Sequence, residues 1–391
     1  MYFQIFDAKK QCKSVLANGV IRDDLSKDMT HTWSYSPHLR DKNIHYAEVW
    51  SKGLTLDDAC PEELKEEWLA LTSKTKAFMK SMQTSKINLN DNCIFELLPD
   101  FFLVDFYSMK NKITEHIFDT MQKPSNYDFL SELYQFLYEI SQRDLKLNFD
   151  NLQWSDKKTR DAFNKVRNAK NKIQYSPWVT ATGRLSTKPN SFPILNLNKE
   201  LRSYIEPTND LFVELDYNAA ELRVLFALLE RDQPSNDLHE WIGEHIFNGK
   251  YERDQVKKKV FSWLYNPKAK NKKLNEFLCR QDVLDKYYDG QFVETPYNRR
   301  IEVDQERALN YVIQSTASDL FLTSAMKIDK MLQEKKSFVA FCVHDSLVLD
   351  VSIEDKAMLN NLAEQFSKTK LGDFKTNISI GKNYGSMKRV K

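Results

Sequence analysis

The fold of this chain of 391 residues is indicated most clearly by the stretch Phe338-Val339-Ala340-Phe341-Cys342-Val343-His344-Asp345-Ser346-Leu347-Val348-Leu349-Asp350-Val351. Two short apolar runs, 338–343 and 346–351, flank a polar tip that contains His344 and Asp345. Apolar runs of this length on both sides of a short polar turn are typical of a β-hairpin. The sequence therefore predicts a hairpin with Asp345 at its tip.

A second predicted strand also ends in an aspartate. It reads Leu211-Phe212-Val213-Glu214-Leu215-Asp216-Tyr217, follows the turn signal Asn209-Asp210, and alternates between apolar and polar residues. If the two strands are neighbours, Asp216 and Asp345 lie at one end of a sheet, where they could hold two divalent ions about 3.5–4 Å apart. Oxygen ligands of this kind favour Mg²⁺. Taken singly, each aspartate is better explained as an ordinary turn residue.

A basic helix is predicted between these two strands. Its residues Arg253, Lys257, Phe261 and Tyr265 recur at four-residue steps and form one slanted face, which drifts by about 40° per step. Phosphates favour the amino-terminal end of a helix, where the two cations lie, and the aromatics would then lie beside a base and sugar. An alternative is that the aromatics belong to the core and the cations are simply exposed. Together with the aspartates, the helix indicates a nucleotidyl-transfer site.

The charge of the chain is locally uneven although its net charge is only +2. Two segments, 157–172 and 257–273, are rich in basic residues. These are Lys157, Lys158, Arg160, Lys165, Arg167, Lys170 and Lys172 in the first, and Lys257, Lys258, Lys259, Lys268, Lys270, Lys272 and Lys273 in the second. One such run alone is most simply a solvated helix face. Two runs around a candidate site favour contact with a phosphate backbone.

Composition excludes several other classes of protein. No run of about 18 apolar residues is present, so we expect no membrane span. The first residues lack a charged and then apolar leader, so we expect no secretion. The five cysteines have no paired spacing, which predicts reduced thiols of a cytoplasmic protein and argues against a zinc ribbon; they are Cys12, Cys60, Cys93, Cys279 and Cys342.

The remaining patterns predict mostly helices. Residues 76–172 have apolar positions at three- and four-residue spacing, best developed over 129–140. We expect a helix from about Ala219, a lysine-rich helical stretch over 235–299, and a long helix over 304–335. A chain of this length has room for about two or three folding units.

Six short motifs, in this order, resemble those of the family A DNA polymerases, the group of bacterial DNA polymerase I and many phage replicases. They are Thr182-Gly183-Arg184-Leu185-Ser186, Asp216-Tyr217-Asn218-Ala219-Ala220-Glu221-Leu222-Arg223, Asp237-Leu238-His239, Arg253-x3-Lys257-x3-Phe261-x3-Tyr265, Asn310-x3-Gln314 and Val343-His344-Asp345-Ser346. The resemblance covers about residues 175–391. Any one motif would be weak, but the ordered set is specific.

The resemblance implies catalytic roles for several residues. Asp216 and Asp345 would be the ligands of two Mg²⁺ ions, assisted by the backbone carbonyl of Tyr217. Arg253, Lys257 and His239 would hold the triphosphate of the incoming nucleotide. Lys257 would also protonate the leaving pyrophosphate.

The resemblance also implies residues that select substrates. Glu221 would block a ribose 2′-hydroxyl, aided by Phe261 and Tyr265 next to the nucleotide. A group of side chains would contact the DNA near the primer end, mostly at the minor-groove edge, namely Arg184, Asn310, Gln314 and His344. Hydrogen-bond acceptors in the minor groove occupy similar places for every base pair, so shape can be checked there without sequence bias.

The implied fold is the right-hand polymerase fold of the α+β class. Its palm, with an antiparallel sheet, would comprise 174–230 and 300–391, its helical fingers 231–299, and a thumb-like helical region 76–173. Residues 1–75 have no assigned role.

The implied function is template-directed DNA polymerase activity, in which deoxynucleotides (dNTPs) are added to the 3′-hydroxyl of a primer. The partners would be primer-template DNA, dNTPs, and a separate exonuclease or processivity factor. The short length favours a phage-type replicase that works in DNA replication in a host cytoplasm. The first 150 residues contain no Asp-x-Glu motif, so we expect no proofreading exonuclease within this chain.

Three departures from the family pattern keep alternatives open. Ser346 stands where these polymerases usually have glutamate, Ala219-Ala220 replaces a Gln-Ile pair, and Asn266 replaces a glycine. The His-Asp-Ser form of the last motif, His344-Asp345-Ser346, is similar to that of single-subunit RNA polymerases. Glu221, and the lack of a methionine near Phe261, favour DNA synthesis instead. A catalytically inactive, DNA-binding replisome component is the remaining alternative.

Overall fold

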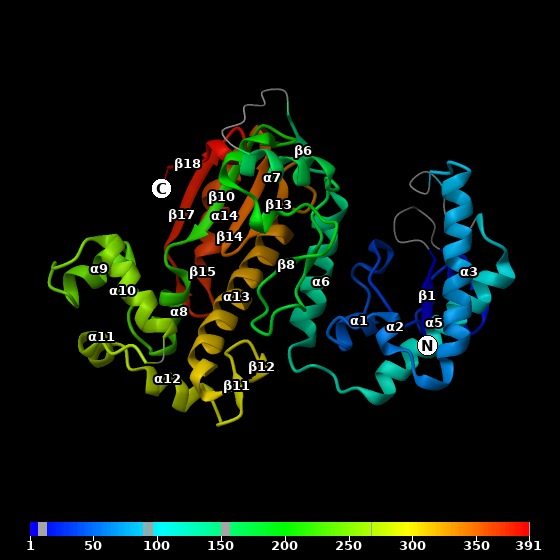
Figure 1. Cartoon of the computed structure of the whole chain (residues 1–391), viewed down its shortest axis with the longest axis horizontal. Coiled ribbons are helices and arrows are strands. Elements are labelled where there is room, and N and C mark those ends of the chain that lie inside the picture. The colour runs from blue at the N-terminus through cyan, green and yellow to red at the C-terminus, as the bar shows by residue number, and fades with distance from the viewer. Residues whose placement is uncertain (7–13, 89–91, 93–96, 150–156, 267, 391) are drawn as a thin grey trace. The chain divides into compact units, whose positions relative to one another are not determined.

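The structure is a computed structural model that describes residues 1–6, 14–88, 92, 97–149, 157–266 and 268–390. The side chains of residues 158, 159, 162 and 165 are also outside the described part, as are Cys12 and Cys93. The chain forms two compact units, Met1–Gln135 and Phe136–Lys391, and each is considered by itself (Figure 1).

The larger unit is built on a five-stranded sheet in the order β13-β14-β10-β17-β18, in which every neighbouring pair is antiparallel. The strands are β10 (Leu211–Tyr217), β13 (Phe338–Val343), β14 (Ser346–Val351), β17 (Thr376–Gly381) and β18 (Lys388–Arg389). The predicted strand and the predicted hairpin are both confirmed. Their predicted proximity is confirmed too, because β10 pairs directly with β14.

Two helices cover one face of this sheet, α13 (Gln305–Met331) and α14 (Leu359–Ser367) (Figure 1). The central strand contacts them through Tyr217, whose ring stacks on Phe366 at 4.4 Å and whose hydroxyl donates to the Phe366 carbonyl oxygen at 2.6 Å. Side chains alternate between the two faces of a strand. Glu214 and Asp216 therefore point to the face opposite α13 and α14.

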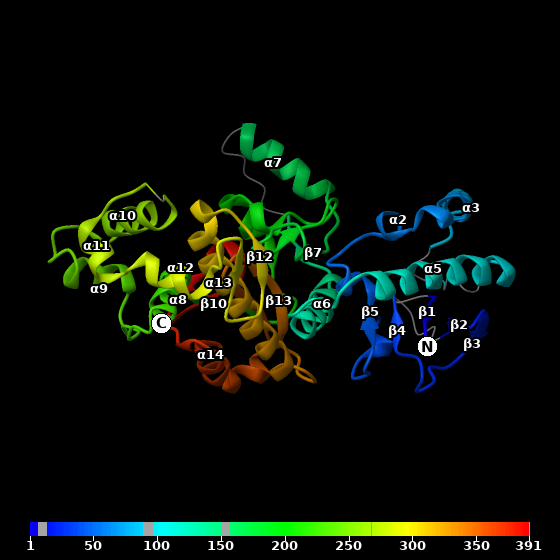
Figure 2. The ribbon, with the colours of Figure 1, turned by 90° about the horizontal axis from the view of Figure 1, so that it is seen from below.

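A group of helices lies to one side of the sheet in both views (Figures 1 and 2). They are α8 (Ala220–Leu228), α9 (Leu238–His245), α10 (Arg253–Tyr265), α11 (Lys272–Phe277) and α12 (Arg280–Tyr287). The helix predicted from about Ala219 is confirmed, as is the long helix that appears as α13. The helical prediction for 235–299 is wrong at its end, because residues 292–302 form the hairpin of β11 (Phe292–Glu294) and β12 (Arg300–Glu302).

Short elements complete the larger unit. β6 (Lys146–Leu147) pairs with β9 (Ile205–Glu206), β7 (Tyr175–Ser176) with β8 (Ser186–Thr187), and β15 (Lys368–Thr369) with β16 (Gly372–Asp373). The basic segment 157–172 contains α7 (Lys157–Asn168), which is anchored by the buried side chains of Phe163 and Val166. Arg160 and Arg167 of this helix are exposed.

The smaller unit packs helices against short strands. β1 (Phe3–Ile5), β2 (Val15–Ala17) and β3 (Val20–Arg22) form one sheet, and β4 (His31–Thr32) pairs with β5 (His45–Tyr46). The helices are α1 (Ala47–Trp50), α2 (Leu56–Ala59), α3 (Lys65–Thr84) and α5 (Asp100–Thr120), and α6 (Tyr127–Gln142) begins in this unit. Trp68, Phe102 and Ile113 belong to its core.

The boundary between the two units falls after Gln135. This position lies inside the helical region 76–173 that the sequence analysis expected. The finer division into thumb, palm and fingers stays a prediction. Among the residues that the structure describes, no helix combines the length and apolar character needed to cross a bilayer.

Candidate active site

The strand register brings the two aspartates of the sequence analysis to one place. Asp216 lies opposite Ser346 of β14 on one side and Asn377 of β17 on the other. Asp345 immediately precedes Ser346 in the hairpin turn, where His344 adopts a left-handed conformation with φ of 55°. Asp216, Asp345 and His344 line one cavity of about 670 Å³.

The two carboxylates are buried, and the pKa of each is raised. Burial and the nearby charge of Asp345 raise the pKa of Asp216 to about 7, while Asn377 opposes this shift by donating to Asp216 Oδ2 at 3.2 Å. Burial also raises the pKa of Asp345. Two buried carboxylates that disfavour each other's charge would be stabilised by a bound cation. The pair therefore fits a divalent metal ion.

The described residues contain no set of three or more His, Cys, Asp or Glu side chains placed to hold a metal ion by themselves. A site made of two carboxylates leaves most of the coordination shell to other oxygen ligands. Mg²⁺ is commonly bound in this way, by one or two carboxylates together with waters and substrate phosphates.

A further carboxylate, that of Glu214, approaches Ser346 of the last motif from the neighbouring strand. The hydroxyl of Ser346 donates to Glu214 Oε1 at 2.8 Å, and Glu214 lies two residues before Asp216, on the same face of β10. Sequence reasoning missed Glu214, because it lies in a regular strand and belongs to none of the motifs. The structure thus places a glutamate beside the serine that departs from the family pattern.

Cationic side chains of α10 line the same cavity. They are Arg253 and Lys257, with Phe261 one turn further along α10. The adjoining face of α10 carries the buried residues Val256, Val260, Trp263 and Leu264. Phe261 and Tyr265 are half-buried rather than core residues, and their rings stack at 5.6 Å.

Arg253 is held in place by an acidic neighbour. Its Nη2 donates to Asp237 Oδ2 at 2.9 Å, while the other oxygen of Asp237 caps α9 by accepting the backbone N–H groups of His239 and Glu240. Hydrogen bonds from Arg253 and Asn218 keep the pKa of Asp237 well below its usual range despite burial. Asp237 therefore stays ionised and couples the start of α9 to the start of α10.

His239 is buried at the edge of the cavity. Burial, together with the charges of Arg253 and Lys257, lowers its pKa to about 4, although Asp237 acts in the opposite direction. The imidazole is therefore neutral at neutral pH. Its Nδ1 is buried and has no hydrogen-bond partner in the described part of the chain.

Two predicted specificity residues contact each other directly. Arg184, which follows Gly183 in the first motif, forms an ion pair with Glu221 in the first turn of α8. Burial raises the pKa of Glu221, and the charge of Arg184 opposes the shift. Both side chains line the cavity, but the sequence carried no signal for their pairing because they lie 37 residues apart.

Several predicted site residues lie outside the cavity lining. Tyr265 contacts the cavity only through its stacking on Phe261, while Asn310 and Gln314 lie on α13 before the lining residues Ala317 and Ser318. Tyr217 does line the cavity, but its ring stacks on Phe366 of α14. The metal contact predicted for Tyr217 concerns its backbone carbonyl and not its side chain. The cavity lining also includes residues that we did not predict, namely Thr180, Leu185, Asn218, Phe321 and Asn377.

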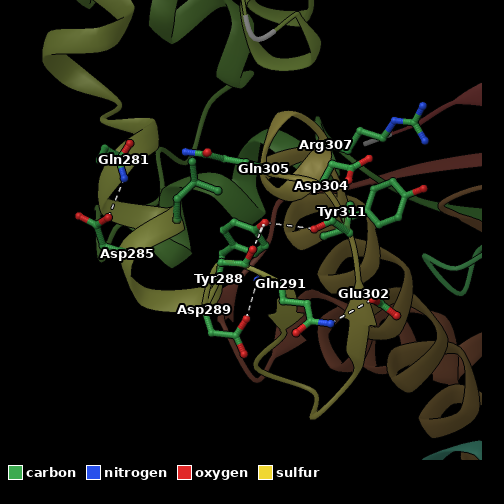
Figure 3. A pocket seen from close by; sticks show the side chains of 13 residues that line it. Gln281, Asp285, Tyr288, Asp289, Gln291, Glu302, Asp304, Gln305, Arg307 and Tyr311 are labelled. Carbon is green, nitrogen blue, oxygen red and sulfur yellow. Dashed lines mark hydrogen bonds between the residues drawn. The ribbon is translucent and has the colours of Figure 1, made fainter.

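A second cavity of about 750 Å³ lies among α12, the β11–β12 hairpin and the start of α13 (Figure 3). Its charged lining residues are mostly acidic, with Arg307 opposed to Asp285, Asp289, Glu302 and Asp304. Asp285 accepts from Gln281, and Asp289 accepts backbone N–H groups, so these carboxylates have local partners (Figure 3). An acidic lining repels phosphate, and this cavity does not fit a nucleotide.

Comparison with known proteins identifies the fold. Residues 279–386 match the family model of DNA polymerase family A. The structure resembles the POL domain of Pol1 from M. smegmatis, which was solved in complex with DNA primer-template and dNTP, with a TM-score of 0.61. This likeness covers 92% of the chain and 87% of that domain at 12% identity. The chain has the α+β fold of the Pol1 POL domain. The predicted fold class is thereby confirmed.

Curated relatives match part of the chain. DNA polymerase I of Lactococcus lactis subsp. cremoris is 25% identical over 246 residues, which are 49% of this chain and 28% of that protein. The DNA polymerase of Mycobacterium phage D29 is 25% identical over 227 residues, which are 48% of this chain and 37% of that protein. The matched region thus spans about a third of the length of these two relatives.

The low pKa of His239 can be measured directly. We expect NMR titration of the free chain to show an imidazole pKa of about 4, assigned by comparison with His239→Gln. Addition of a deoxynucleoside triphosphate should raise this pKa, because a bound anion stabilises the imidazolium. A value close to the ordinary 6.5 in the free chain would contradict the burial described above.

Proposed function

We propose that this chain is a template-directed DNA polymerase, which adds deoxynucleotides to the 3′-hydroxyl of a primer and releases pyrophosphate. One observation carries the proposal. A single cavity joins the two aspartates at the end of the sheet, Asp216 and Asp345, to the two cations of α10, Arg253 and Lys257. The fold shared with a polymerase domain that binds DNA primer-template and dNTP supports the same reading.

Two Mg²⁺ ions are the proposed cofactors. Asp216 and Asp345 would hold them, with the backbone carbonyl of Tyr217 as a further ligand. When bound, such ions stabilise the negative charge that develops on the attacking and leaving oxygens of an in-line displacement. The raised pKa values of the two aspartates are consistent with a site in which a bound cation would stabilise the ionised carboxylates.

The residues of α9 and α10 would bind the triphosphate. Lys257 and Arg253 supply positive charge near the amino-terminal end of α10, where the helix dipole also favours anions. Asp237 holds Arg253 through one nitrogen, so other guanidinium donors remain for phosphate oxygens. Neutral His239 would donate a hydrogen bond rather than a charge. Lys257 would protonate the leaving pyrophosphate, since phosphoryl transfer depends mainly on positioning and charge stabilisation.

Sugar selection would depend on Glu221. Its carboxylate lines the cavity from the first turn of α8, near Phe261, and is 14% exposed. A bulky acidic side chain at this place would collide with a ribose 2′-hydroxyl. Tyr265 would assist by supporting the ring of Phe261, on which it stacks.

Primer-template DNA is the proposed macromolecular partner. Its proposed contacts near the primer end are Arg184, Asn310, Gln314 and His344. The exposed basic residues of α7 and of the segment 257–273 would add contacts to the phosphate backbone, and such contacts weaken as salt concentration rises. A separate exonuclease or processivity factor remains a proposed partner.

The finer role in phage DNA replication is also a proposal. The relatives include both a bacterial and a phage polymerase at similar identity. A location in a host cytoplasm stays a prediction of the same kind. Ser346 keeps the RNA polymerase-like alternative open, and a comparison of deoxynucleotides with ribonucleotides in primer extension separates the two activities.

Removal of Asp345 tests the proposed function. We expect Asp345→Ala to reduce primer extension by on the order of 10³-fold or more, because the site would lose a metal ligand. Binding of primer-template DNA, measured by fluorescence anisotropy, should change little. The matched control is Asp285→Ala, which removes an acidic residue of the second cavity and should leave extension unchanged. Normal turnover by Asp345→Ala would remove Asp345 from the active site.

Replacement of Glu221 tests sugar selection. We expect Glu221→Ala to improve ribonucleotide incorporation relative to deoxynucleotide incorporation by up to about 100-fold, or about 2.7 kcal/mol. Single-nucleotide incorporation kinetics measure the ratio. Arg184→Ala is the matched control, since it breaks the same ion pair but keeps the carboxylate. Equal gains in the two variants would show that the carboxylate is not the gate.

A further inference from the structure

The tip of the β11–β12 hairpin is joined to α13 by a buried ion pair. Arg299 donates from Nε to Asp319 Oδ2 at 2.8 Å and from Nη2 to Asp319 Oδ1 at 2.7 Å. The side chain of Asp319 is fully buried and that of Arg299 is 12% exposed. Two parallel hydrogen bonds of this kind fix the plane of the guanidinium as well as its position.

The guanidinium of Arg299 lies directly against Gly183. A Cβ atom added at Gly183 would be 2.3 Å from Arg299 Nη2, and Gly183 also has a left-handed conformation with φ of +74°. Only glycine satisfies both conditions without strain. The planar side chain of Arg299 therefore forms the surface on which the backbone of Gly183 rests.

A second contact fixes the same loop from α13. The hydroxyl of Ser318, the residue before Asp319, donates to the carbonyl oxygen of Gly183 at 2.9 Å. Within the loop, the Gly183 N–H donates to the Thr180 carbonyl oxygen at 3.1 Å, and the Thr180 hydroxyl donates to the carbonyl oxygen of Arg184 at 2.8 Å. The backbone on both sides of the Gly183–Arg184 peptide is thus held in place.

Arg184 follows Gly183 directly, and its side chain lines the cavity. Its backbone is held by Gly183 and Thr180, while its side chain reaches Glu221 on α8. A long arginine side chain has many rotamers, so its reach is defined only if its backbone is fixed. The contacts of Arg299, Asp319 and Ser318 supply that fixed point.

We propose that Arg299 and Asp319 act as positioning residues. They would fix the backbone of residues 180–184, here called the Gly183 loop, so that the Arg184 side chain contacts the primer end at a defined place. The inference rests on the proposed function, because it takes Arg184 to contact the DNA. Arg299 itself does not line the cavity, so it would act only through Arg184.

A double-mutant cycle tests whether Arg299 acts through Arg184. Arg299→Lys keeps the positive charge but loses the planar, two-pronged contact with Asp319. We expect it to lower the rate of primer extension at saturating dNTP by about tenfold, with a smaller change in the KM for dNTP. In an Arg184→Ala background, the same substitution should change the rate by less than about twofold. Equal losses in the two backgrounds would overturn the proposal.

Two further variants test whether a lower rate of Arg299→Lys reflects only a loss of protein stability. Ser318→Ala removes only the hydroxyl contact with Gly183, and its smaller rate loss should also disappear in the Arg184→Ala background. Arg300→Lys changes the neighbouring arginine, which is exposed and lies over the ring of Phe292. It should leave extension unchanged. A loss with Arg300→Lys as large as that with Arg299→Lys would contradict a specific role for Arg299.

An activity-independent measurement separates this inference from the proposed function. Hydrogen–deuterium exchange of the free chain should be faster over residues 178–186 in Arg299→Lys than in the wild type, with the sheet strands unaffected. Unchanged exchange there would contradict the positioning role even in an active enzyme. Faster exchange together with an inactive wild-type chain would support the seating of the loop and reject the polymerase function.

Discussion

The register of β10 against β14 is the constraint on which the site depends. It places Asp216 opposite Ser346, so that Asp345 lies at the same end of the sheet. A slip of one residue would turn Asp216 toward α13 and α14, since successive side chains of a strand point to opposite faces. Tyr217 opposes such a slip, because its buried hydroxyl is bonded to the Phe366 carbonyl and its ring is stacked on Phe366. The packing of the core thus sets the position of the two carboxylates.

The cavity is lined by two acidic residues from the sheet end and by two basic residues from α10. Burial raises the pKa values of its acidic part, Asp216 and Asp345, even though the charges of Arg184 and Lys257 act in the opposite direction on Asp345, whereas Arg253 is already paired with Asp237. His239 adds a neutral donor. A ligand that combines divalent cations with a polyphosphate would complement both parts at once. This complementarity gives a physical reason why the substrate would bind with its metal ions rather than alone.

The sequence predicted the elements with strong local signals. The apolar runs around His344 and Asp345, the alternation of β10 and the four-residue steps of α10 all correspond to observed elements. The β11–β12 hairpin was missed, since its strands have three residues each and lie in polar sequence without clear alternation. The contact of Ser346 with Glu214 and that of Arg299 with Asp319 could not be predicted either, because such contacts join distant segments and leave no periodic pattern.

The most direct test of the account is whether one metal ion touches both β10 and the β13–β14 turn. Fe²⁺ bound in place of Mg²⁺ reduces added hydrogen peroxide to hydroxide and a hydroxyl radical, ascorbate returns the resulting Fe³⁺ to Fe²⁺, and the radicals cut the backbone close to the ion. The account predicts cuts near both Asp216 and Asp345, which Mg²⁺ suppresses and which Asp216→Asn removes together. Cuts at only one of the two segments, or cuts confined to the acidic cavity around Asp285, would contradict it.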